Sequence, residues 1–435
     1  MTDTSTRRRR FPRLRTLIAT IAALAVLPTG ALPAAATSNE EPNWWYTGMH
    51  VEDARNEGLT GAGVKIAVID AQINPNLNLF TGASLTVDPV TSCDVPVTSQ
   101  DVDAAALHGT ASAALIVARP VGELPMQGIA PDAAVTFYSS GAEDCVGRAG
   151  EASPTMAAIA RAVADGNRII SISEAQTFHN DEDAEVIADA LAAGVVIVSS
   201  TANTQEQRAA VAPSQFNGVV SVAAVSRDGM LLTDAGRPVI TPSVTVVAPG
   251  VNILVPGSAN GWDRMSSTNG SSVATPLVAG ALALLLQKYP TATGNQLIQA
   301  LITTTSQSRE GQPRNDTNGG GYGAISLPYL LAADPTTLPD VNPLMNQPLG
   351  VPTREQITGD TPTPTPTAVP TTAIPPTSSP TSTPEPPVTT PPAAESAPDT
   401  LASVLPWLIG GGSFAMVIIV VLVIVLATRT RKPRL

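Results

Sequence analysis

The alternation of short β-branched runs with helix-forming segments, starting at Val64, is the feature that most restricts the fold of this chain. The candidate strands read VKIAVID, AAVTFY, RIISIS, VVIVSST, VVSVAAV and VTVVAPG. Such nearly continuous apolar strands are typical of a parallel sheet whose two faces are both covered. Ser153, Pro154 and Gly166 mark the start and end of one intervening helix, and residues 183–193 form a second. We therefore predict an α/β fold with a doubly wound, mostly parallel sheet and helices on both faces.

Residues 1–36 have the layout of a secretory signal peptide. An arginine cluster at residues 7–10 precedes an apolar run at residues 17–27, and small residues extend to Ala36. This order predicts export and cleavage after Ala36, which leaves residues 37–62 as an N-terminal extension. The alternative is an uncleaved signal anchor.

Residues 403–428 predict one C-terminal transmembrane helix. The segment 407–427 carries no charge and, at about 1.5 Å per residue, is long enough to cross the hydrocarbon layer. Residues 429–435 are basic and follow directly, so the positive-inside rule assigns them to the cytoplasm. The prediction is a single-pass cell-membrane protein whose folded domain, residues 63–335, is extracytoplasmic.

A Pro/Thr-rich linker, residues 336–402, connects the folded domain to the predicted membrane helix. Residues 352–398 contain almost no large apolar side chain, so this part cannot bury a core and is expected to be extended. At about 3.1 Å per residue it could hold the domain up to roughly 140 Å from the membrane.

The charge of the chain restricts its partners. The formal net charge is −12, and basic residues cluster only at the two termini, which argues against a nucleic-acid partner. The sequence contains no phosphate-binding glycine loop and no Cys/His metal cluster, so we expect no cofactor and no metal.

Cys93 and Cys145 are the two cysteines of the chain. In an exported domain oxidation is expected, and we predict one disulfide between them. The alternative is a pair of free, buried thiols.

Two serines begin a long apolar helix in the run SSTNGSSVATPLVAGALALLLQ. A serine at a helix start benefits from unpaired N–H groups and from the positive end of the helix dipole, which favour developing negative charge. Pro276 is compatible with this helix because it falls in the first turn. Taken alone, Ser272 in this position is more typical of a helix cap than of a nucleophile.

The histidines restrict the choice of a general base for such a serine. His50 lies in a short N-terminal segment, and His179 lies in a polar stretch, FHNDED, that is typical of a solvated loop. His108 starts a small-residue helix in LHGTASAALIVARP and is the remaining candidate. Asp70 ends the strand VKIAVID, where its side chain would emerge at the carboxyl edge of the sheet and could orient an imidazole.

The chain order Asp70, His108, Ser272, with these local motifs, resembles the subtilase family of serine proteases over residues 60–331. The motifs that carry the resemblance are VKIAVID, HGTAS, GIAPDAAV, VVAPGVNI and GSSVATPLVAG. The resemblance implies a subtilisin-like fold, with residues 63–335 as the catalytic domain of a serine-type endopeptidase.

The resemblance also implies roles for individual residues. Ser272 corresponds to the nucleophile, His108 to the general base and Asp70 to the residue that orients the base. The segment SSTANT resembles the oxyanion-hole region, so Asn203 would donate its amide to the oxyanion. A region similar to the substrate-binding strand implies three further contact residues, which are Ser173, Glu174 and Ala175.

The sequence departs from the family pattern at three places. Ala71 and Gln72 follow Asp70 where the family usually has Ser or Thr and then Gly. Glu174 and Ala175 stand where the family usually has Leu and Gly, and Ser271 stands in place of the usual Thr. These departures lie at the aspartate turn, the specificity pocket and the serine motif.

The short N-terminal extension, the HGTA-type motif, the segment GGGYGAISLPYLL, the Pro-rich linker and the terminal helix together resemble the mycosins. Mycosins are membrane-anchored subtilases of actinobacterial type VII secretion systems. This resemblance implies a protease of protein or peptide substrates that also stabilises a membrane secretion complex.

Two other hypotheses remain at this stage. The first is a catalytically impaired subtilase-fold scaffold that stabilises a membrane secretion complex, which predicts that His108 lies out of hydrogen-bond reach of either Ser272 or Asp70. The second is a cell-wall adhesin on a stalk, which explains the linker and the anchor but not the ordered motifs.

Overall fold

The computed structural model describes residues 43–121, 126–141, 145, 152–174, 181–207, 213–242 and 244–352. All of them belong to the first of two compact units, Met1–Thr365, and the second unit, Pro366–Leu435, lies outside the described residues. Several predicted features also lie outside them: the signal peptide (1–36), the linker beyond residue 352, the transmembrane helix (403–428), the basic tail (429–435), Ala175 and His179.

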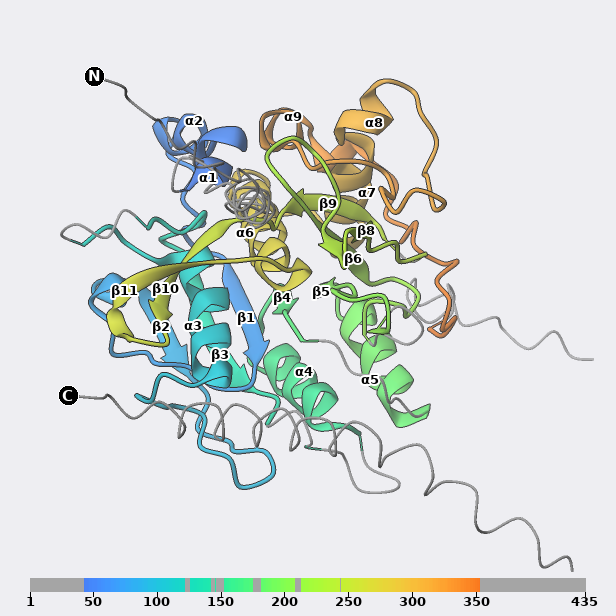
Figure 1. The fold of residues 1–435 in the computed structure, drawn as a ribbon. Coiled ribbons are helices and arrows are strands. Elements are labelled where there is room, and N and C mark those ends of the chain that lie inside the picture. The colour runs from blue at the N-terminus through green and yellow to red at the C-terminus, as the bar shows by residue number, and fades with distance from the viewer. Residues whose placement is uncertain are drawn as a thin grey trace, which may run out of the picture. The chain divides into compact units, whose positions relative to one another are not determined.

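A seven-stranded sheet forms the centre of the domain, in the order β2-β3-β1-β4-β5-β6-β9. Every pairing within it is parallel (Figure 1). The residues of β4, β5, β6 and β9 are all buried, as their apolar composition predicts. The strands are β1 (Lys65–Asp70), β2 (Ser84–Val87), β3 (Ala134–Ser139), β4 (Ile169–Ile172), β5 (Val196–Ser200), β6 (Val220–Val225) and β9 (Val246–Pro249).

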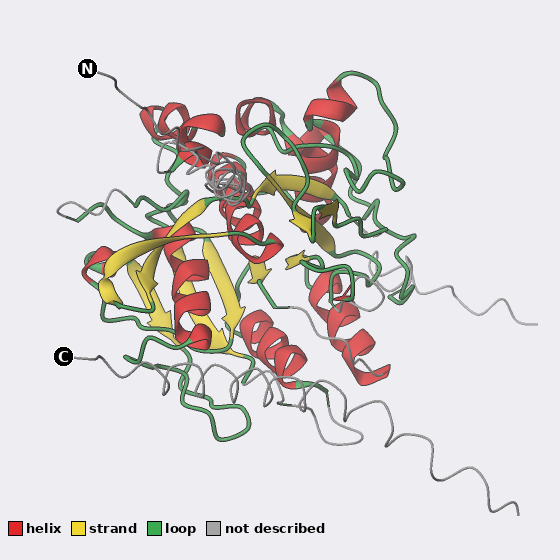
Figure 2. Ribbon diagram, viewed as in Figure 1, coloured by secondary structure: helices red, strands yellow, loops and turns green. Residues whose placement is uncertain are grey.

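Helices cover both faces of this sheet, which confirms the predicted doubly wound arrangement (Figure 2). Alternate residues of β1 show the two layers, because successive side chains of a strand point to opposite faces. Ile66 and Val68 belong to a core cluster with α3, α6 and α7, whereas Ala67 and Ile69 belong to a second cluster with α4 and α5. These helices are α3 (Ala104–Val117), α4 (Pro154–Ala164), α5 (Asp181–Ala192), α6 (Ser271–Lys288) and α7 (Gly294–Thr303).

The start and end of α4 follow the predicted punctuation. Ser153 is the N-cap and accepts a hydrogen bond from the Met156 N–H, and Pro154 occupies the first turn. Gly166 follows the helix with a φ of 77°, a left-handed conformation that glycine adopts without strain.

Helix α6 is, within the described ranges, the one helix that is long and apolar enough to cross a membrane. However, 89% of this window is buried inside the domain, so α6 is the central core helix of the domain. Length and composition alone do not separate such a helix from a membrane span.

The described part of the N-terminal extension, residues 43–62, packs against the domain. Its helices, α1 (Trp44–Gly48) and α2 (Val51–Asn56), bury Trp44, Trp45 and Val51. The indole Nε1 of Trp44 donates to the Val251 carbonyl at 3.1 Å, which joins segments 207 residues apart. The extension is therefore part of the folded core.

Smaller elements complete the described chain. Strands β10 and β11 form an antiparallel hairpin, and β7 and β8 form a second, short one. These elements are β7 (Thr233–Asp234), β8 (Arg237–Pro238), β10 (Ile253–Ser258), β11 (Gly261–Thr268), α8 (Ser306–Arg309), α9 (Leu327–Ala332) and the 3-10 turns Asn78–Phe80 and Pro335–Thr337.

The predicted disulfide is present between Cys93 and Cys145, whose Cα atoms are 5.8 Å apart. It joins positions separated by 52 residues. Sulfur atoms of both cysteines are thereby paired, which excludes the alternative of two free thiols.

Replacing both cysteines by serine is expected to lower the free energy of unfolding by about 4 kcal/mol, because a loop of this length restricts the unfolded chain. Denaturant unfolding of the oxidised wild type and the double variant measures the difference. The reduced wild type is the matched control and should lose a similar amount. Equal stability of all three proteins would contradict a stabilising role for the bond.

Candidate active site

The carboxyl ends of β1 and β4 form the topological switch point of the sheet. From β1 the order runs through β3 to β2 on one side and through β4, β5 and β6 to β9 on the other. In open α/β sheets, ligand-binding crevices lie at this position. Ile69 and Ile172 are register partners, so Asp70 and Ser173, the next residue along each strand, lie at the same level of this edge.

Asp70 is fully buried and hydrogen-bonded to His108. The His108 Nδ1 atom lies 2.8 Å from Asp70 Oδ1, which also accepts the Ala71 N–H at 2.9 Å. Asp70 Oδ2 accepts the Ser112 hydroxyl at 2.9 Å. Because the carboxylate accepts at Oδ1, the proton of a neutral His108 belongs on Nδ1, and Nε2 is left to accept a proton from a nucleophile.

Ser112 is a site residue that the motif analysis did not single out. It lies one helical turn after His108 on α3, and its Oγ also lies 3.2 Å from the His108 carbonyl oxygen. The i, i+4 spacing within HGTAS was the available signal, since residues four apart share a helix face.

Two hydrogen bonds hold the turn after Asp70, in which Ala71 and Gln72 depart from the family pattern. The Ser139 hydroxyl donates to the Ala71 carbonyl at 2.8 Å, and the Gln72 side-chain amide donates to the Pro96 carbonyl at 2.8 Å. A Cβ atom at Gly109 would lie 2.2 Å from the Gln72 carbonyl oxygen. The glycine after His108 therefore allows α3 to approach this turn closely.

Ser272 lies in the first turn of α6 and is 8% exposed. A Cβ atom built on Gly270 would lie 2.9 Å from Ser272 Oγ and 3.4 Å from Asn203 Nδ2. The hydroxyl and the amide nitrogen therefore border the same small space, which Gly270 leaves open. First-turn N–H groups of a helix lack intrahelical partners and face such a space.

The orientation of the Asn203 amide follows from its contacts with Ser271. The Ser271 N–H donates to Asn203 Oδ1 at 2.7 Å, which identifies this atom as the amide oxygen. Nδ2 and Oδ1 lie 3.4 and 3.6 Å from a Cβ position at Gly270, so both border this space and Nδ2 is the atom that can donate into it. The Ser271 hydroxyl lies 2.5 Å from the Thr201 carbonyl oxygen and 3.0 Å from Asn203 Oδ1. Ser271, which replaces the usual Thr of the family, thus positions the amide.

Ser173 connects the end of β4 to the start of α6. Its buried hydroxyl donates to the Ser272 carbonyl at 2.8 Å. The prediction that Pro276 falls in the first turn of α6 is wrong, because α6 begins at Ser271 and Pro276 lies inside it. Pro276 has no N–H to donate to the Ser272 carbonyl, and the Ser173 hydroxyl supplies a donor instead. Glu174 follows Ser173 and is half-buried, and its charge helps to raise the pKa of His108. Ala175, the third predicted substrate contact, lies outside the described residues.

Within the described part of the chain, no hydrogen bond joins His108 to Ser272. Of the two contacts whose loss the scaffold hypothesis predicts, the structure therefore has the one between His108 and Asp70 and lacks the one between His108 and Ser272. Contacts between nucleophile and base are often long in an unliganded site and shorten when substrate binds.

The Asp70 carboxylate raises the pKa of His108 to about 9. Burial of the ring acts in the opposite direction, while the hydrogen bond to Asp70 and the charge of Glu174 add to the increase. An unperturbed histidine titrates near pH 6.5. The His108 side chain is 38% exposed, so the site is open to substrate on the side of the ring away from Asp70.

We expect kcat/KM for peptide hydrolysis to rise with pH through a midpoint at the pKa of His108, about 9. A general base must be neutral to accept a proton. The same pair links stability to pH: its contribution to folding is complete below about pH 6.5 and is lost as the pH rises through about 9. A pH series of initial rates, with unfolding measured in parallel, tests both. A midpoint of the rate profile at or below about pH 6.5 would contradict the assignment of His108, paired with Asp70, as the general base.

Other predicted candidates lie away from this edge. His50 is exposed and pairs with Asp53 at 3.1 Å, which agrees with its exclusion as the base. Among the described residues, no group of three or more His, Cys, Asp or Glu side chains is arranged to hold a metal ion.

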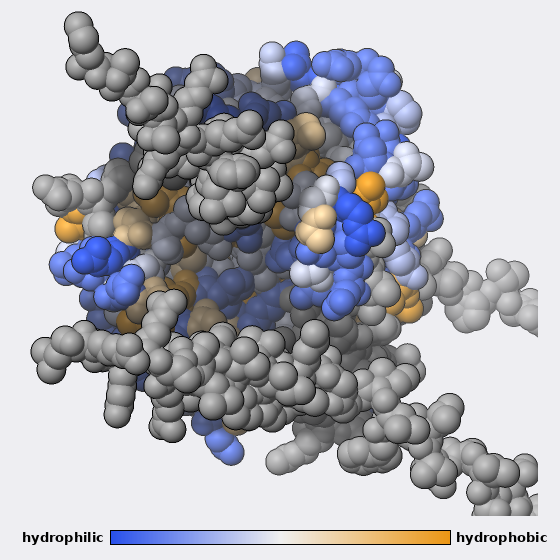
Figure 3. Space-filling view, in the orientation of Figure 1, coloured by the Kyte–Doolittle hydropathy of each residue, from blue (hydrophilic) through white to orange (hydrophobic). Residues whose placement is uncertain are grey.

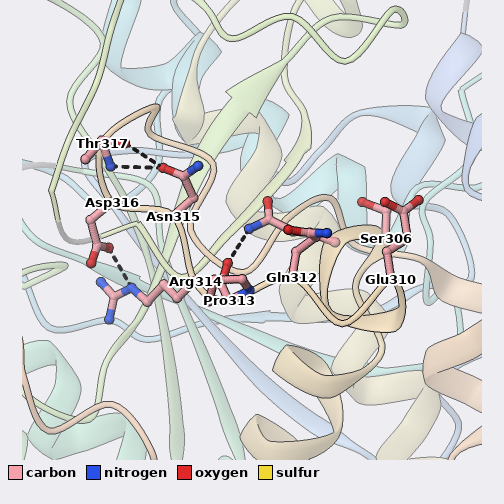
Figure 4. A pocket seen from close by; sticks show the side chains of 9 residues that line it. Ser306, Glu310, Gln312, Pro313, Arg314, Asn315, Asp316 and Thr317 are labelled. Carbon is pink, nitrogen blue, oxygen red and sulfur yellow. Dashed lines mark hydrogen bonds and ion pairs between the residues drawn. The ribbon is translucent and has the colours of Figure 1, made fainter.

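A pocket of about 690 Å³ lies around α8 and the loop that follows it (Figure 4). It is polar: Arg314 pairs with Asp316 at 2.7 Å, and the Asn315 side-chain oxygen accepts the Thr317 N–H at 3.1 Å. Hydrophilic side chains also dominate this part of the surface, at the upper right of Figure 3. None of Asp70, His108 and Ser272 lines this pocket, so it is not the candidate active site.

The profile of the subtilase family matches residues 61–323. The chain belongs to the subtilase family of serine endopeptidases. It is 30% identical over 275 residues to the thermostable alkaline protease of Halalkalibacterium halodurans, covering 62% of this chain and 70% of that protein. It is 30% identical over 263 residues to subtilisin E of Bacillus subtilis, covering 58% of this chain and 62% of that protein.

Solved subtilase structures share the fold. Fervidolysin from Fervidobacterium pennivorans, a keratinolytic enzyme related to subtilisin, aligns with a TM-score of 0.56 at 25% identity over 68% of this chain and 46% of that chain. MycP1 from the ESX-1 type VII secretion system aligns with a TM-score of 0.56 at 21% identity over 71% of this chain and 91% of that chain. At this identity the second similarity concerns the fold alone.

In this subtilase the predicted site residues form two connected groups. Asp70 and His108 are joined by a direct hydrogen bond. Ser272 is joined to Ser173 through its carbonyl and to Asn203 through the neighbouring Ser271. Both groups lie at the same edge of the sheet.

Proposed function

We propose that this subtilase is a membrane-anchored, extracytoplasmic endopeptidase that cleaves peptide bonds with Asp70, His108 and Ser272. The observation that carries the proposal is the 2.8 Å hydrogen bond between His108 Nδ1 and a buried Asp70 carboxylate, which two further donors hold in place. A hydrogen bond of this kind orients the neutral imidazole and keeps its proton on Nδ1, so that Nε2 can accept the proton of a nucleophile.

The reaction is acyl transfer. Ser272 Oγ attacks the substrate carbonyl carbon, and His108 Nε2 takes the hydroxyl proton and then gives it to the leaving amine. Water, activated by the same histidine, then cleaves the acyl ester and restores the serine. Asp70 keeps the proton on Nδ1 and stabilises the imidazolium that forms.

The oxyanion is stabilised by Asn203 Nδ2 and the N–H of Ser272. The contact of Asn203 Oδ1 with the Ser271 N–H supports this role, because it leaves Nδ2 as the atom that can donate into the space beside Ser272 Oγ. Removing one donor of this kind costs about 3 to 4 kcal/mol of transition-state stabilisation.

Extended substrate runs along the segment that continues from β4, with Ser173, Glu174 and Ala175 as its contacts. The hydrogen bond from Ser173 to the Ser272 carbonyl supports this path, because it fixes that segment next to the nucleophile. A peptide that lies alongside an extended segment beyond the end of a paired strand gains main-chain hydrogen bonds.

Residues 403–428 anchor the enzyme, the tail 429–435 is cytoplasmic, and the catalytic domain acts outside the membrane. We also assign it to a type VII secretion complex. The shared fold with MycP1 of the ESX-1 type VII secretion system and the anchored layout of the sequence support this partner. Co-purification of the intact membrane protein with secretion components tests the assignment.

Labelling with a fluorophosphonate probe tests the catalytic proposal. We expect the folded, exported wild type to be labelled at Ser272 and Ser272→Ala to remain unlabelled, because the probe reacts only with an activated serine. If the folded wild type is unlabelled, and Ser272→Ala supports secretion while deletion of the chain does not, the scaffold hypothesis replaces the enzyme.

A further inference from the structure

The disulfide lies beside the turn that follows Asp70. The two parts of the chain that it connects, residues 92–99 and the end of β3, both form hydrogen bonds with residues 71–73. Two separate paths of contacts therefore connect the disulfide with the backbone next to the Asp70 carboxylate.

The first path pairs the chain after Cys93 with this turn. The Ile73 N–H donates to the Val97 carbonyl at 3.0 Å, and the Ile73 carbonyl accepts the Ser99 N–H at 3.0 Å. These bonds form a short parallel bridge, to which the Gln72 side-chain amide adds its contact with the same segment.

The second path runs from Cys145 through the end of β3. A Cβ atom at Gly141 would lie 2.6 Å from Cys145 Sγ, so the disulfide packs directly on this glycine. The Gly141 N–H donates to the Ser139 hydroxyl at 3.1 Å, and that hydroxyl donates to the Ala71 carbonyl at 2.8 Å. The Ser139 hydroxyl thus links the glycine under the disulfide to the first residue after Asp70.

The hairpin turn that contains Cys93 has a strained backbone. The Val95 N–H donates to the Ser92 carbonyl at 3.1 Å, and the two residues between them, Cys93 and Asp94, have φ of 54° and 59°. Two-residue turns with a positive φ at both central positions favour Asn-Gly, because most other side chains rarely adopt a left-handed conformation. The disulfide is a covalent constraint on this turn, and its loss allows the turn to relax.

Both paths lead to the carboxylate that orients the base. The Ala71 N–H donates to Asp70 Oδ1, the oxygen that also binds His108 Nδ1 at 2.8 Å. A shift of the turn therefore changes the position of Asp70 Oδ1 relative to the imidazole. A displacement of about 1 Å at a catalytic group can lower a rate about a hundred-fold.

We propose that Cys93 and Cys145 are positioning residues for the Asp70–His108 pair, so that the oxidised enzyme is active and reduction of the disulfide lowers its rate. Cys93 is exposed and Cys145 is buried, so an external thiol reaches the bond from the side of Cys93. A dithiol reductant supplies two electrons and two protons, which convert the disulfide into two thiols, and is itself oxidised to a disulfide. The kinetic part of this inference rests on the proposed function.

Steady-state kinetics of the purified full-length chain in detergent, with and without dithiothreitol, test the proposal. We expect reduction to lower kcat by about tenfold to a hundred-fold and to change KM by less than about twofold, because Asp70 acts on the base and not on the substrate. Reoxidation should restore kcat. The chain has two cysteines and both are in this bond, so the reductant has no other target in it.

Two variants separate position from stability. The double variant Cys93→Ser, Cys145→Ser should have the kcat of the reduced wild type and should not respond to dithiothreitol. The matched control is Ile187→Ala, a cavity at a fully buried position of α5, in the core layer on the opposite side of the sheet from α3 and α6. It should lower stability and keep the wild-type kcat.

Ser139→Ala tests the second path in the oxidised protein. It removes the hydroxyl between Gly141 and Ala71 and leaves the disulfide in place. We expect kcat to fall, and reduction to lower it further by a smaller factor than in the wild type, because both changes act on the same path.

A second readout does not depend on catalysis. Asp70 is the main cause of the raised pKa of His108, and the charge of Glu174 adds to it. A looser contact with Asp70 should therefore lower the pKa of His108 toward about 6.5. An NMR titration of isotope-labelled histidine side chains measures this in the oxidised and the reduced protein, with the exposed His50 as the internal control.

The outcomes are distinguishable. A folded, reduced wild type that keeps the kcat and the His108 titration of the oxidised protein overturns the inference, as does an equal loss of kcat in Ile187→Ala. If reduction unfolds the protein, oxidised Ser139→Ala decides, and an unchanged kcat and His108 titration overturn the inference. Absence of hydrolysis and of fluorophosphonate labelling in the folded, oxidised wild type overturns the proposed function, whereas a His108 titration that depends on the disulfide still supports the positioning role.

Discussion

Ser272→Ala is expected to lower kcat for peptide hydrolysis by about a million-fold. In the proposed mechanism the substitution removes the oxygen that attacks the carbonyl, and neither His108 nor Asp70 can supply a substitute for it. Residual catalysis over water would come from Asn203 and substrate binding alone. Initial rates on a single peptide, with circular dichroism to confirm folding, measure the effect.

Ser271→Ala is the matched control, because it makes the same change in the adjacent residue of the same helical turn. Its hydroxyl lies against the Thr201 carbonyl and the Asn203 side-chain oxygen, so its loss affects the position of the amide only. We expect at most about a hundred-fold decrease, below the cost of deleting an oxyanion donor altogether. Equal effects of the two substitutions would contradict the assignment of Ser272 as the nucleophile.

Asp70→Asn is expected to lower kcat by about ten-thousand-fold. An amide at this position can donate to Nδ1, which favours the tautomer with the proton on Nε2, where the base must accept. The substitution also removes the charge that most raises the pKa of His108. The ascending limb of the pH profile should therefore move to lower pH while the maximal rate falls.

Asp53→Asn provides the matched control for this variant. It breaks a second Asp–His pair, His50 Nδ1 to Asp53 Oδ2 at 3.1 Å, in which both side chains are exposed. Exposed pairs contribute little, and this one lies away from the sheet edge, so rate and pH profile should stay unchanged. A decrease in Asp70→Asn no larger than in this control would show that Asp70 does not orient the base.

The main strands and helices, and their alternation along the chain, were predictable because their signals are local. Apolar runs without polar interruption predicted buried parallel strands, and Ser153, Pro154 and Gly166 predicted the ends of α4. The disulfide was predictable because an exported chain with only two cysteines can form only one intramolecular disulfide.

The sequence by itself also determined which residue types could carry the chemistry, because few histidines accompany an ordered set of motifs. Only the tertiary structure decided how they meet. The orientation of the Asn203 amide depends on Ser271, and the position of Asp70 depends on Ser112, through contacts across chain separations of 68 and 42 residues.

Burial was likewise decided by the tertiary structure. Helix α6 has the composition of a membrane span but forms the core of the domain, and the N-terminal extension inserts Trp45 into that core. Ser173 lies level with Asp70 only because β4 is adjacent to β1. The periodicity of apolar residues shows which face of a helix or strand is apolar. It does not show what covers that face, because the covering strands and helices come from distant parts of the chain.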